Sequence, residues 1–223
     1  MVSVIPQRPP RHLLCAPRRY LLDAGATLWR VHSRAYDATT FNPSDAAHDP
    51  FGGGRFDSTD ADPYGYYYAG LSDVTALAET FARDLPFNDG YRLLKRHALK
   101  ERRISAVRTV RPLYLVDLLD GAALAAVAQD PALINAEGPA YARTRAIGRW
   151  LRGQALWAQG FIWPSSRDIG RPTLVLFADR QAGAALSPAV SRQIDLDDGP
   201  GADWLNATLA PLRIAVRPSP RRR

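Results

Sequence analysis

Two arginines in the first quarter of the chain have the side chain that proteins use to bind phosphate. Arg30 lies inside the apolar run TLWRVH, and Arg55 follows the three glycines Gly52 to Gly54. A guanidinium can hold a phosphate through two parallel hydrogen bonds, and backbone N–H groups beside glycines can form a concave anion site. Each arginine also has a structural explanation. Arg30 could face water from an edge strand, and Arg55 could be solvated on a flexible loop.

Tyrosines and a glutamate follow the glycine loop. Tyr66 and Tyr68 share one face if they belong to a strand, where they either pack in the core or stack on a flat ligand ring. Glu79 lies about 140° from the apolar stripe of a predicted helix, which favours a solvated glutamate paired with Arg83. Periodicity alone therefore places Glu79 outside the core.

Two serines follow the sequence GFIWP and precede Arg167. A proline that ends a strand, followed by serines that cap a turn, accounts for Ser165 and Ser166 structurally. No base beside them in the sequence would make either serine a nucleophile.

The elements that must position these residues are short. We expect strands at 27–32, 66–69, 102–110, 113–118, 161–163, 173–177, 192–196 and 212–216. Ser72 and Asp73 signal the N-terminus of a helix that continues to about residue 84, and further helices are expected at 121–129, 139–158 and 203–210. The long segment 33–65 is expected to be a functional or disordered loop. Because strands and helices mix without regular βαβ alternation, the pattern predicts an α+β fold.

Composition limits the remaining classes. A chain of 223 residues is long enough for one self-sufficient domain. We divide it into an irregular N-terminal arm (1–20), one catalytic domain (21–216) and a disordered basic tail (217–223). Cys15 is the only cysteine, the four histidines show no ligand spacing, and no apolar run reaches about 18 residues. We therefore expect no disulfide, no metal site and no membrane span.

The net charge of +7 raises a second class, the nucleic-acid-binding module. Arg102 and Arg103 support that alternative, but much of the excess charge lies in the tail. The sequence contains no phosphate-binding P-loop, no G-x-G-x-x-G after a strand, no H-E-x-x-H and no G-x-S-x-G. The common nucleotide, metalloprotease and serine hydrolase signatures are thus absent.

Four segments, taken in order, resemble the RES-domain family, which is named for an arginine, a glutamate and a serine. They are LWRVH, GGGRFD, YYYAGLSDVTALAET and GFIWPSSRDIGRPTLVLF. The resemblance spans about residues 27–180 and extends to about 216. It implies three catalytic residues, Arg30, Glu79 and Ser165. It also implies four substrate-binding residues, Arg55, Tyr68, Gly54 and Tyr66.

The resemblance implies an ADP-ribosyltransferase-like fold, with short mixed or antiparallel sheets flanked by helices. It also implies a cytoplasmic bacterial toxin that is paired with an Xre-type antitoxin and reaches nucleic acid only through that antitoxin. Members of the family consume NAD. NAD would be the substrate and inorganic phosphate the co-substrate, with no bound cofactor. Phosphorolysis, hydrolysis and transfer of ADP-ribose to a protein all stay open.

The implied chemistry gives each residue a role. Cleaving the nicotinamide–ribose bond builds oxocarbenium character at the ribose, which the Glu79 carboxylate would stabilise. Arg30 and Arg55, with the glycine loop, would hold the pyrophosphate. Tyr68 would stack on a ring, and Ser165 would hydrogen-bond the ribose or support the strand geometry around it.

Overall fold

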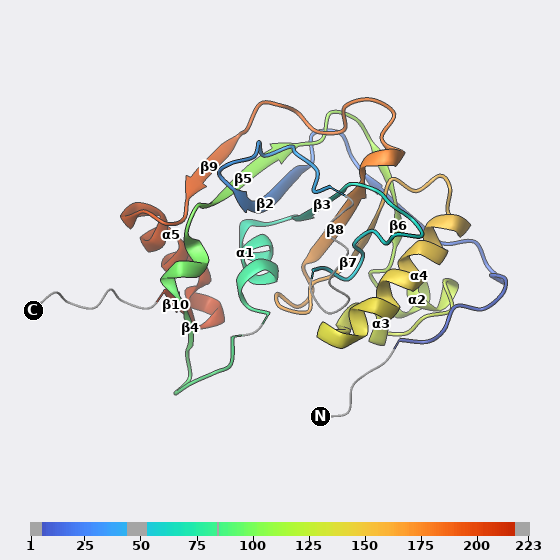
Figure 1. Ribbon diagram of the computed structural model, residues 1–223, viewed down its shortest axis with the longest axis horizontal. Coiled ribbons are helices and arrows are strands. Elements are labelled where there is room, and N and C mark those ends of the chain that lie inside the picture. The colour runs from blue at the N-terminus through green and yellow to red at the C-terminus, as the bar shows by residue number, and fades with distance from the viewer. Residues whose placement is uncertain (1–5, 44–52, 84, 217–223) are drawn as a thin grey trace, which may run out of the picture.

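The computed structural model describes residues 6–43, 53–83 and 85–216, and its centre is one mixed sheet of eight strands (Figure 1). The strand order is β1-β6-β7-β8-β3-β2-β5-β9. The strands are β1 (Arg19–Leu22), β2 (Thr27–Ser33), β3 (Tyr66–Gly70), β5 (Arg102–Arg108), β6 (Leu113–Asp117), β7 (Gly160–Pro164), β8 (Pro172–Phe177) and β9 (Arg192–Asp195). A second, parallel sheet pairs β4 (Arg92–Leu94) with β10 (Ile214–Val216).

Five α-helices lie around these sheets in the described part of the chain. They are α1 (Asp73–Phe81), α2 (Gly121–Ala126), α3 (Ala132–Asn135), α4 (Tyr141–Gln154) and α5 (Gly199–Leu209). In Figure 1, α2, α3 and α4 gather at one end of the molecule and α5 lies with the small sheet at the other. Helix α1 begins where the Ser72 hydroxyl accepts a hydrogen bond from the Thr75 amide at 3.1 Å, as its N-cap sequence predicts.

The large sheet is divided at its middle. Strand β2 pairs with β5 along seven residues and β3 pairs with β8 along five, whereas β2 and β3 pair only at Trp29 and Gly70. Two half-sheets, β1-β6-β7-β8-β3 and β2-β5-β9, therefore meet at one residue pair, which we call the fork. Gly70 is required there because a Cβ would lie 2.8 Å from the Ala76 amide nitrogen.

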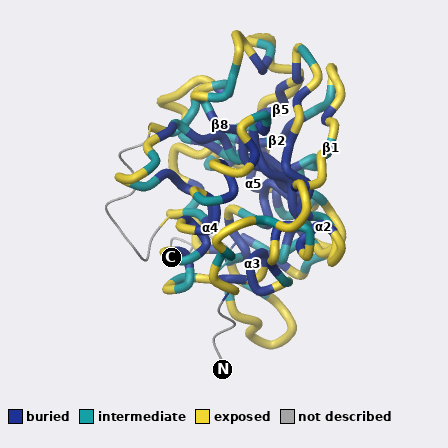
Figure 2. Tube along the Cα trace, turned by 90° about the vertical axis from the view of Figure 1, so that its right-hand side faces the viewer, coloured by how far each residue is buried: buried dark blue, intermediate teal, exposed yellow. Residues whose placement is uncertain are grey.

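The central strands consist largely of buried residues, which are dark blue in Figure 2. One cluster includes Phe56, Phe161 and Trp163 and packs beneath α4. Another includes Leu77 of α1 and Leu205 of α5. The two clusters hold the helices that flank the fork.

The structure confirms the α+β class, the eight expected strands and the four expected helices, with shifted ends. Helix α5 starts at Gly199 instead of residue 203 because the Asp198 carboxylate caps the Gly201 amide at 2.6 Å. The sequence analysis missed β1, β4 and α3, and β1 begins inside the segment 1–20 that was expected to be an arm. Residues 217–223, the expected tail, lie outside the described residues. None of the described helices combines the length and apolar character needed to cross a bilayer.

Candidate active site

A cavity of about 650 Å³ opens at the fork. Its walls come from β2, β3, α1 and the segments on either side of residues 44–52. It is lined by six of the seven predicted site residues, which are Arg30, Gly54, Arg55, Tyr66, Tyr68 and Glu79. The seventh, Ser165, is not among the residues that line the cavity but forms a hydrogen bond with Glu79, which is.

Glu79 projects from α1 and is fixed by Ser165. The Ser165 hydroxyl donates to Glu79 Oε1 at 2.5 Å, while its oxygen accepts from the amides of Arg167 and Asp168 at 3.1 and 2.9 Å. Because two backbone donors orient this hydroxyl, its proton is directed at the carboxylate. Of the two serines, Ser165 is therefore the one that forms this hydrogen bond with Glu79.

The Glu79–Arg83 pair that periodicity favoured is not formed within the described residues. Arg83 Nη1 instead donates to the carbonyl of Gly53 at 2.8 Å, and its guanidinium lies 5.4 Å from the ring of Tyr141. Glu79 is half-buried on the cavity wall. Its carboxylate thus belongs to the cavity instead of to the exposed helix surface.

Arg30 is buried on an internal strand, so the alternative of a water-facing edge strand is wrong. Its Nη2 donates to Asn42 Oδ1 at 2.9 Å, its Nη1 donates to the carbonyl of Thr40, and the guanidinium stacks 4.4 Å from the ring of Tyr67. Burial lowers the pKa of Arg30 and raises the pKa of Tyr67 to about 12. Arg30 therefore holds the segment before residue 44 against β2.

Arg55 is also buried, with 6% of its surface exposed, and is not the solvated loop residue of the alternative interpretation. Its Nη2 donates to the carbonyl of Ala136 at 3.1 Å, and the rings of Tyr141 and Trp163 lie 5.9 Å from the guanidinium. Its Nε is buried and has no hydrogen-bond partner among the described residues. Burial lowers the pKa of Arg55, and the charge of Glu79 opposes that shift.

Tyr68 lines the cavity with its ring, but its hydroxyl is already used inside the protein. The hydroxyl donates to Asp57 Oδ1 at 2.9 Å and accepts from the Phe56 amide at 2.9 Å. Its ring packs edge-on against Tyr66 and Trp163, with centroids 5.7 and 6.2 Å away. Burial, and then the charge of Asp57, raises the pKa of Tyr68 well above its usual value.

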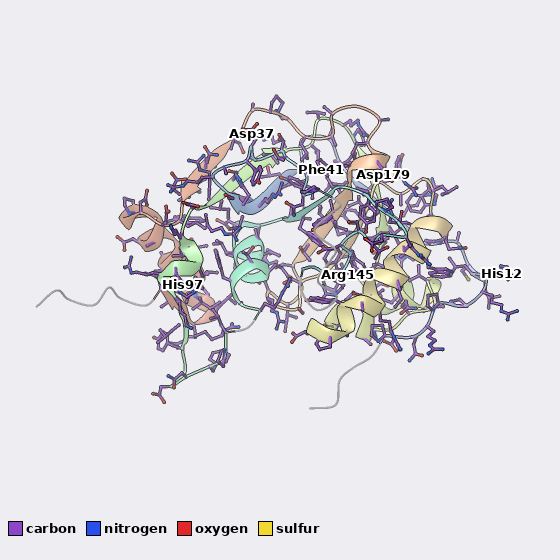
Figure 3. All side chains as sticks on the ribbon, viewed as in Figure 1. His12, Asp37, Phe41, His97, Arg145 and Asp179 are labelled. Atoms are coloured by element: carbon purple, nitrogen blue, oxygen red, sulfur yellow. The ribbon has the colours of Figure 1, made fainter. Side chains whose placement is uncertain are left out.

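Sequence reasoning missed two residues beneath the glycine loop. Asp57 Oδ2 accepts from the Gly54 amide at 2.6 Å, and Arg145 of α4 (labelled in Figure 3) donates from Nε to the Gly54 carbonyl at 3.2 Å. The Gly54 amide is thus paired with an internal carboxylate. The available signal was the inward position of Arg145 on the predicted helix.

His32 also faces the cavity and was not predicted. Its Nδ1 donates to the carbonyl of Ser33 at 2.9 Å, so its Nε2 accepts from the Ser105 hydroxyl at 2.9 Å. Burial, with the charges of Arg30 and Arg103, lowers the pKa of His32. The ring is therefore held in its neutral form. No cluster of three or more acidic, histidine or cysteine side chains suited to a metal is found in the described ranges.

The fold and the site define an α+β protein in which a glutamate anchored by a serine shares a cavity with two buried arginines. A family model of the RES domain matches residues 27–198, and the chain therefore belongs to the RES-domain family. This confirms the resemblance drawn from the sequence.

One solved structure extends the comparison. It is the crystal structure of the M. tuberculosis MbcT–MbcA toxin–antitoxin complex, which matches with a TM-score of 0.55 and 19% identity over 79% of this chain and 86% of that chain. Likeness at this identity establishes a shared fold. A comparison with curated proteins found no match.

Proposed function

We propose that this protein is the toxin of a toxin–antitoxin pair and degrades NAD by phosphorolysis. The products are nicotinamide and ADP-ribose 1''-phosphate. The observation that carries the proposal is the contact between Ser165 and Glu79 at 2.5 Å on the wall of a cavity that also holds Arg30 and Arg55. Membership of the RES-domain family and the likeness to a chain from a toxin–antitoxin complex support it.

The reaction needs a fixed negative charge beside the ribose. As the bond between ribose C1'' and the nicotinamide nitrogen breaks, its electron pair leaves with nicotinamide and C1'' gains oxocarbenium character. A phosphate oxygen then forms the new bond to C1''. Glu79 would stabilise the cation through a carboxylate that Ser165 already holds in place, so little reorganisation is needed during reaction.

The arginines would bind the substrate phosphates. Arg55 offers a buried Nε with no partner among the described residues, and a phosphate oxygen would satisfy this donor. Arg30 keeps its positive charge at physiological pH and lines the same cavity. Catalysis would rest on positioning and electrostatics, with no bound cofactor or metal.

A protein ADP-ribosyltransferase is the second candidate, because the same site could pass ADP-ribose to a protein nucleophile. The nucleic-acid-binding alternative is weaker. It was suggested by the basic net charge, the Arg-rich tail and the pair Arg102 and Arg103, and Arg103 forms an ion pair with Asp195 at 2.5 Å. The antitoxin we propose is of the Xre type, and nucleic acid would be reached only through it.

Incubating the purified protein with NAD, with and without phosphate, tests the proposal. Phosphate-dependent formation of ADP-ribose 1''-phosphate, detected by mass spectrometry, supports phosphorolysis. ADP-ribose alone would indicate hydrolysis, and label from NAD retained on protein would indicate transfer. If NAD does not change under any condition, the enzyme proposal fails.

A further inference from the structure

The segment that carries Arg55 lies along helix α4. The Thr144 hydroxyl donates to the Arg55 carbonyl at 2.7 Å, and Arg145 Nε donates to the Gly54 carbonyl at 3.2 Å. The next residue of the segment, Phe56, packs closely on the same helix, because a Cβ at Gly148 would lie 3.1 Å from its ring. Helix α4 is therefore a platform for this loop.

Two arginines on α4 face two carboxylates of the same segment. Arg145 and Arg152 are seven residues apart, which places them on one helix face. Arg145 Nη2 lies 3.9 Å from Asp57 Oδ2, with only 4% and 2% of the two side chains exposed. Arg152 Nε lies 2.8 Å from Asp62 Oδ2 and the same side chain also pairs with Asp179. The first pair borders the cavity, and the second lies away from it.

Asp57 occupies the concave side of the glycine turn. Its two oxygens accept from the Gly54 amide at 2.6 Å and from the Tyr68 hydroxyl at 2.9 Å. Gly53 has a φ of +76°, and a Cβ at Gly54 would lie 2.6 Å from Asp57 Oδ1 and 2.7 Å from the Tyr68 hydroxyl. The glycines are thus needed so that an internal carboxylate can approach, and this carboxylate takes the place that a bound anion takes in other glycine turns.

We propose that Asp57 and Arg145 are positioning residues for Arg55. Asp57 closes the turn 53–57 as an internal anion, and Arg145 neutralises it while tying the turn to α4. Arg55 lies within this turn, so its guanidinium is kept at the cavity, and its Nε, which has no partner among the described residues, can donate to a ligand phosphate. The Tyr68 hydroxyl then acts through Asp57 instead of touching the ligand. The proposal has a kinetic form, that these residues lower the KM for NAD, which rests on the proposed NAD cleavage. It also has a structural form, that they hold the turn 53–57 in place, which does not rest on it.

Steady-state kinetics on full-length variants test the kinetic form. We expect Asp57→Asn to raise the KM for NAD about tenfold while kcat stays within about threefold, as expected for loss of uniform binding. The double variant Asp57→Asn/Arg55→Ala should be no worse than Arg55→Ala, because a residue that acts only through Arg55 loses its effect without it. Independent, additive effects, or an unchanged KM in Asp57→Asn, would overturn the proposal.

Asp62→Asn is the matched control. It removes a carboxylate from the same loop and the same helix face, but Arg152 keeps Asp179 and the cavity is untouched. Its KM and kcat should equal those of the wild type. If Asp62→Asn raises KM as much as Asp57→Asn does, the effect is general loosening of the loop and the proposal fails.

Two measurements protect the test against a variant that does not fold and against failure of the proposed function. Tyr68→Phe keeps the ring and removes one hydrogen bond to Asp57, so it should raise KM in the same direction by a smaller factor. Amide hydrogen exchange of the ligand-free protein should be faster over 53–57 in Asp57→Asn but not in Asp62→Asn. If amide exchange over 53–57 is unchanged in Asp57→Asn, the structural form is wrong, whether or not the wild type consumes NAD. If the wild type consumes no NAD, that result alone rejects only the proposed function.

Discussion

The two sides of the cavity use the same residue type in opposite ways. On the β2 side, Arg30 donates to Thr40 and Asn42 and stacks on Tyr67. On the loop side, Arg55 has one carbonyl partner through Nη2 and a buried Nε without a partner in the described part of the chain. A buried donor left without a partner is costly. Within the described residues, Arg55 therefore retains a donor that a ligand could satisfy, whereas both terminal nitrogens of Arg30 are used to complete the fold.

The difference follows from what each arginine connects. Asn42 pairs with Tyr66 of β3 through two backbone hydrogen bonds, of 2.8 and 3.0 Å. Arg30 on β2 therefore ties the segment 40–42, and through it β3, across the fork. Arg55 makes no such link between the half-sheets, because its turn is held by Asp57 and α4.

Arg30→Ala should have the largest effect. Two acceptors lose a charged donor, and such hydrogen bonds contribute about 1.5–3 kcal/mol each, so we expect the free energy of unfolding to fall by about 3–6 kcal/mol. NAD cleavage should also be abolished. Chemical denaturation and an NAD-loss assay on the same preparation measure both. If the free energy of unfolding does not change, Arg30 does not stabilise the fold and this difference between Arg30 and Arg55 is wrong.

Glu79→Gln should reduce activity without this loss of stability. The amide keeps an oxygen that can accept from Ser165, but the negative charge beside the ribose is gone. Loss of a group that stabilises transition-state charge commonly lowers kcat by about 100-fold or more. Turnover near that of the wild type, with a normal unfolding curve, would contradict the role given to Glu79.

Arg55→Ala should weaken substrate binding and leave the fold stable. The variant removes one charged hydrogen bond, from Nη2 to the Ala136 carbonyl, together with an Nε donor that has no partner among the described residues. The free energy of unfolding should therefore fall by about 1–2 kcal/mol, which is less than in Arg30→Ala. We expect a KM for NAD at least about tenfold higher. A loss of stability as large as that of Arg30→Ala would show that the two sides of the cavity do not differ.

The smallest effect concerns His32 on the β2 side. Its pKa is lowered in the folded state, so below about pH 6.5 the unfolded chain binds a proton that the folded chain does not. Stability from this group is complete above that pH and is lost as pH falls towards the folded pKa. His32→Gln should therefore show a shallower decline in unfolding free energy between pH 7.5 and 5.5. Parallel profiles for the two proteins would refute this.

Local patterns predicted the elements but not how they meet. Alternation and turn residues identified the strands, and the Ser72 cap gave the start of α1, because these signals lie within a few residues. The divided sheet could not be predicted, since the single pairing of Trp29 with Gly70 depends on how distant strands are arranged.

The same limit explains the site. Helical periodicity predicted that Glu79 faces solvent, because it considers only the residues of the helix and not the turn between β7 and β8 that packs against it. That turn packs on α1, where Thr75 donates to Asp168 at 2.7 Å and Ser165 donates to Glu79. Asp57 and Arg145 were invisible for the same reason, because they are 88 residues apart in the sequence. The family resemblance supplied residues that composition and spacing could not.

The division of the sheet also determines which strands can pair while the chain is still being synthesised. When Tyr66–Gly70 leaves the ribosome, it can pair with β2 at one residue, and its full-length neighbour, Pro172–Phe177, has yet to be made. Ser165, which fixes Glu79, comes from the same late part of the chain. A nascent or truncated chain that stops before about residue 177 therefore contains both arginines and the glutamate but cannot assemble them. The cavity is completed only after residues 160–177 have been synthesised.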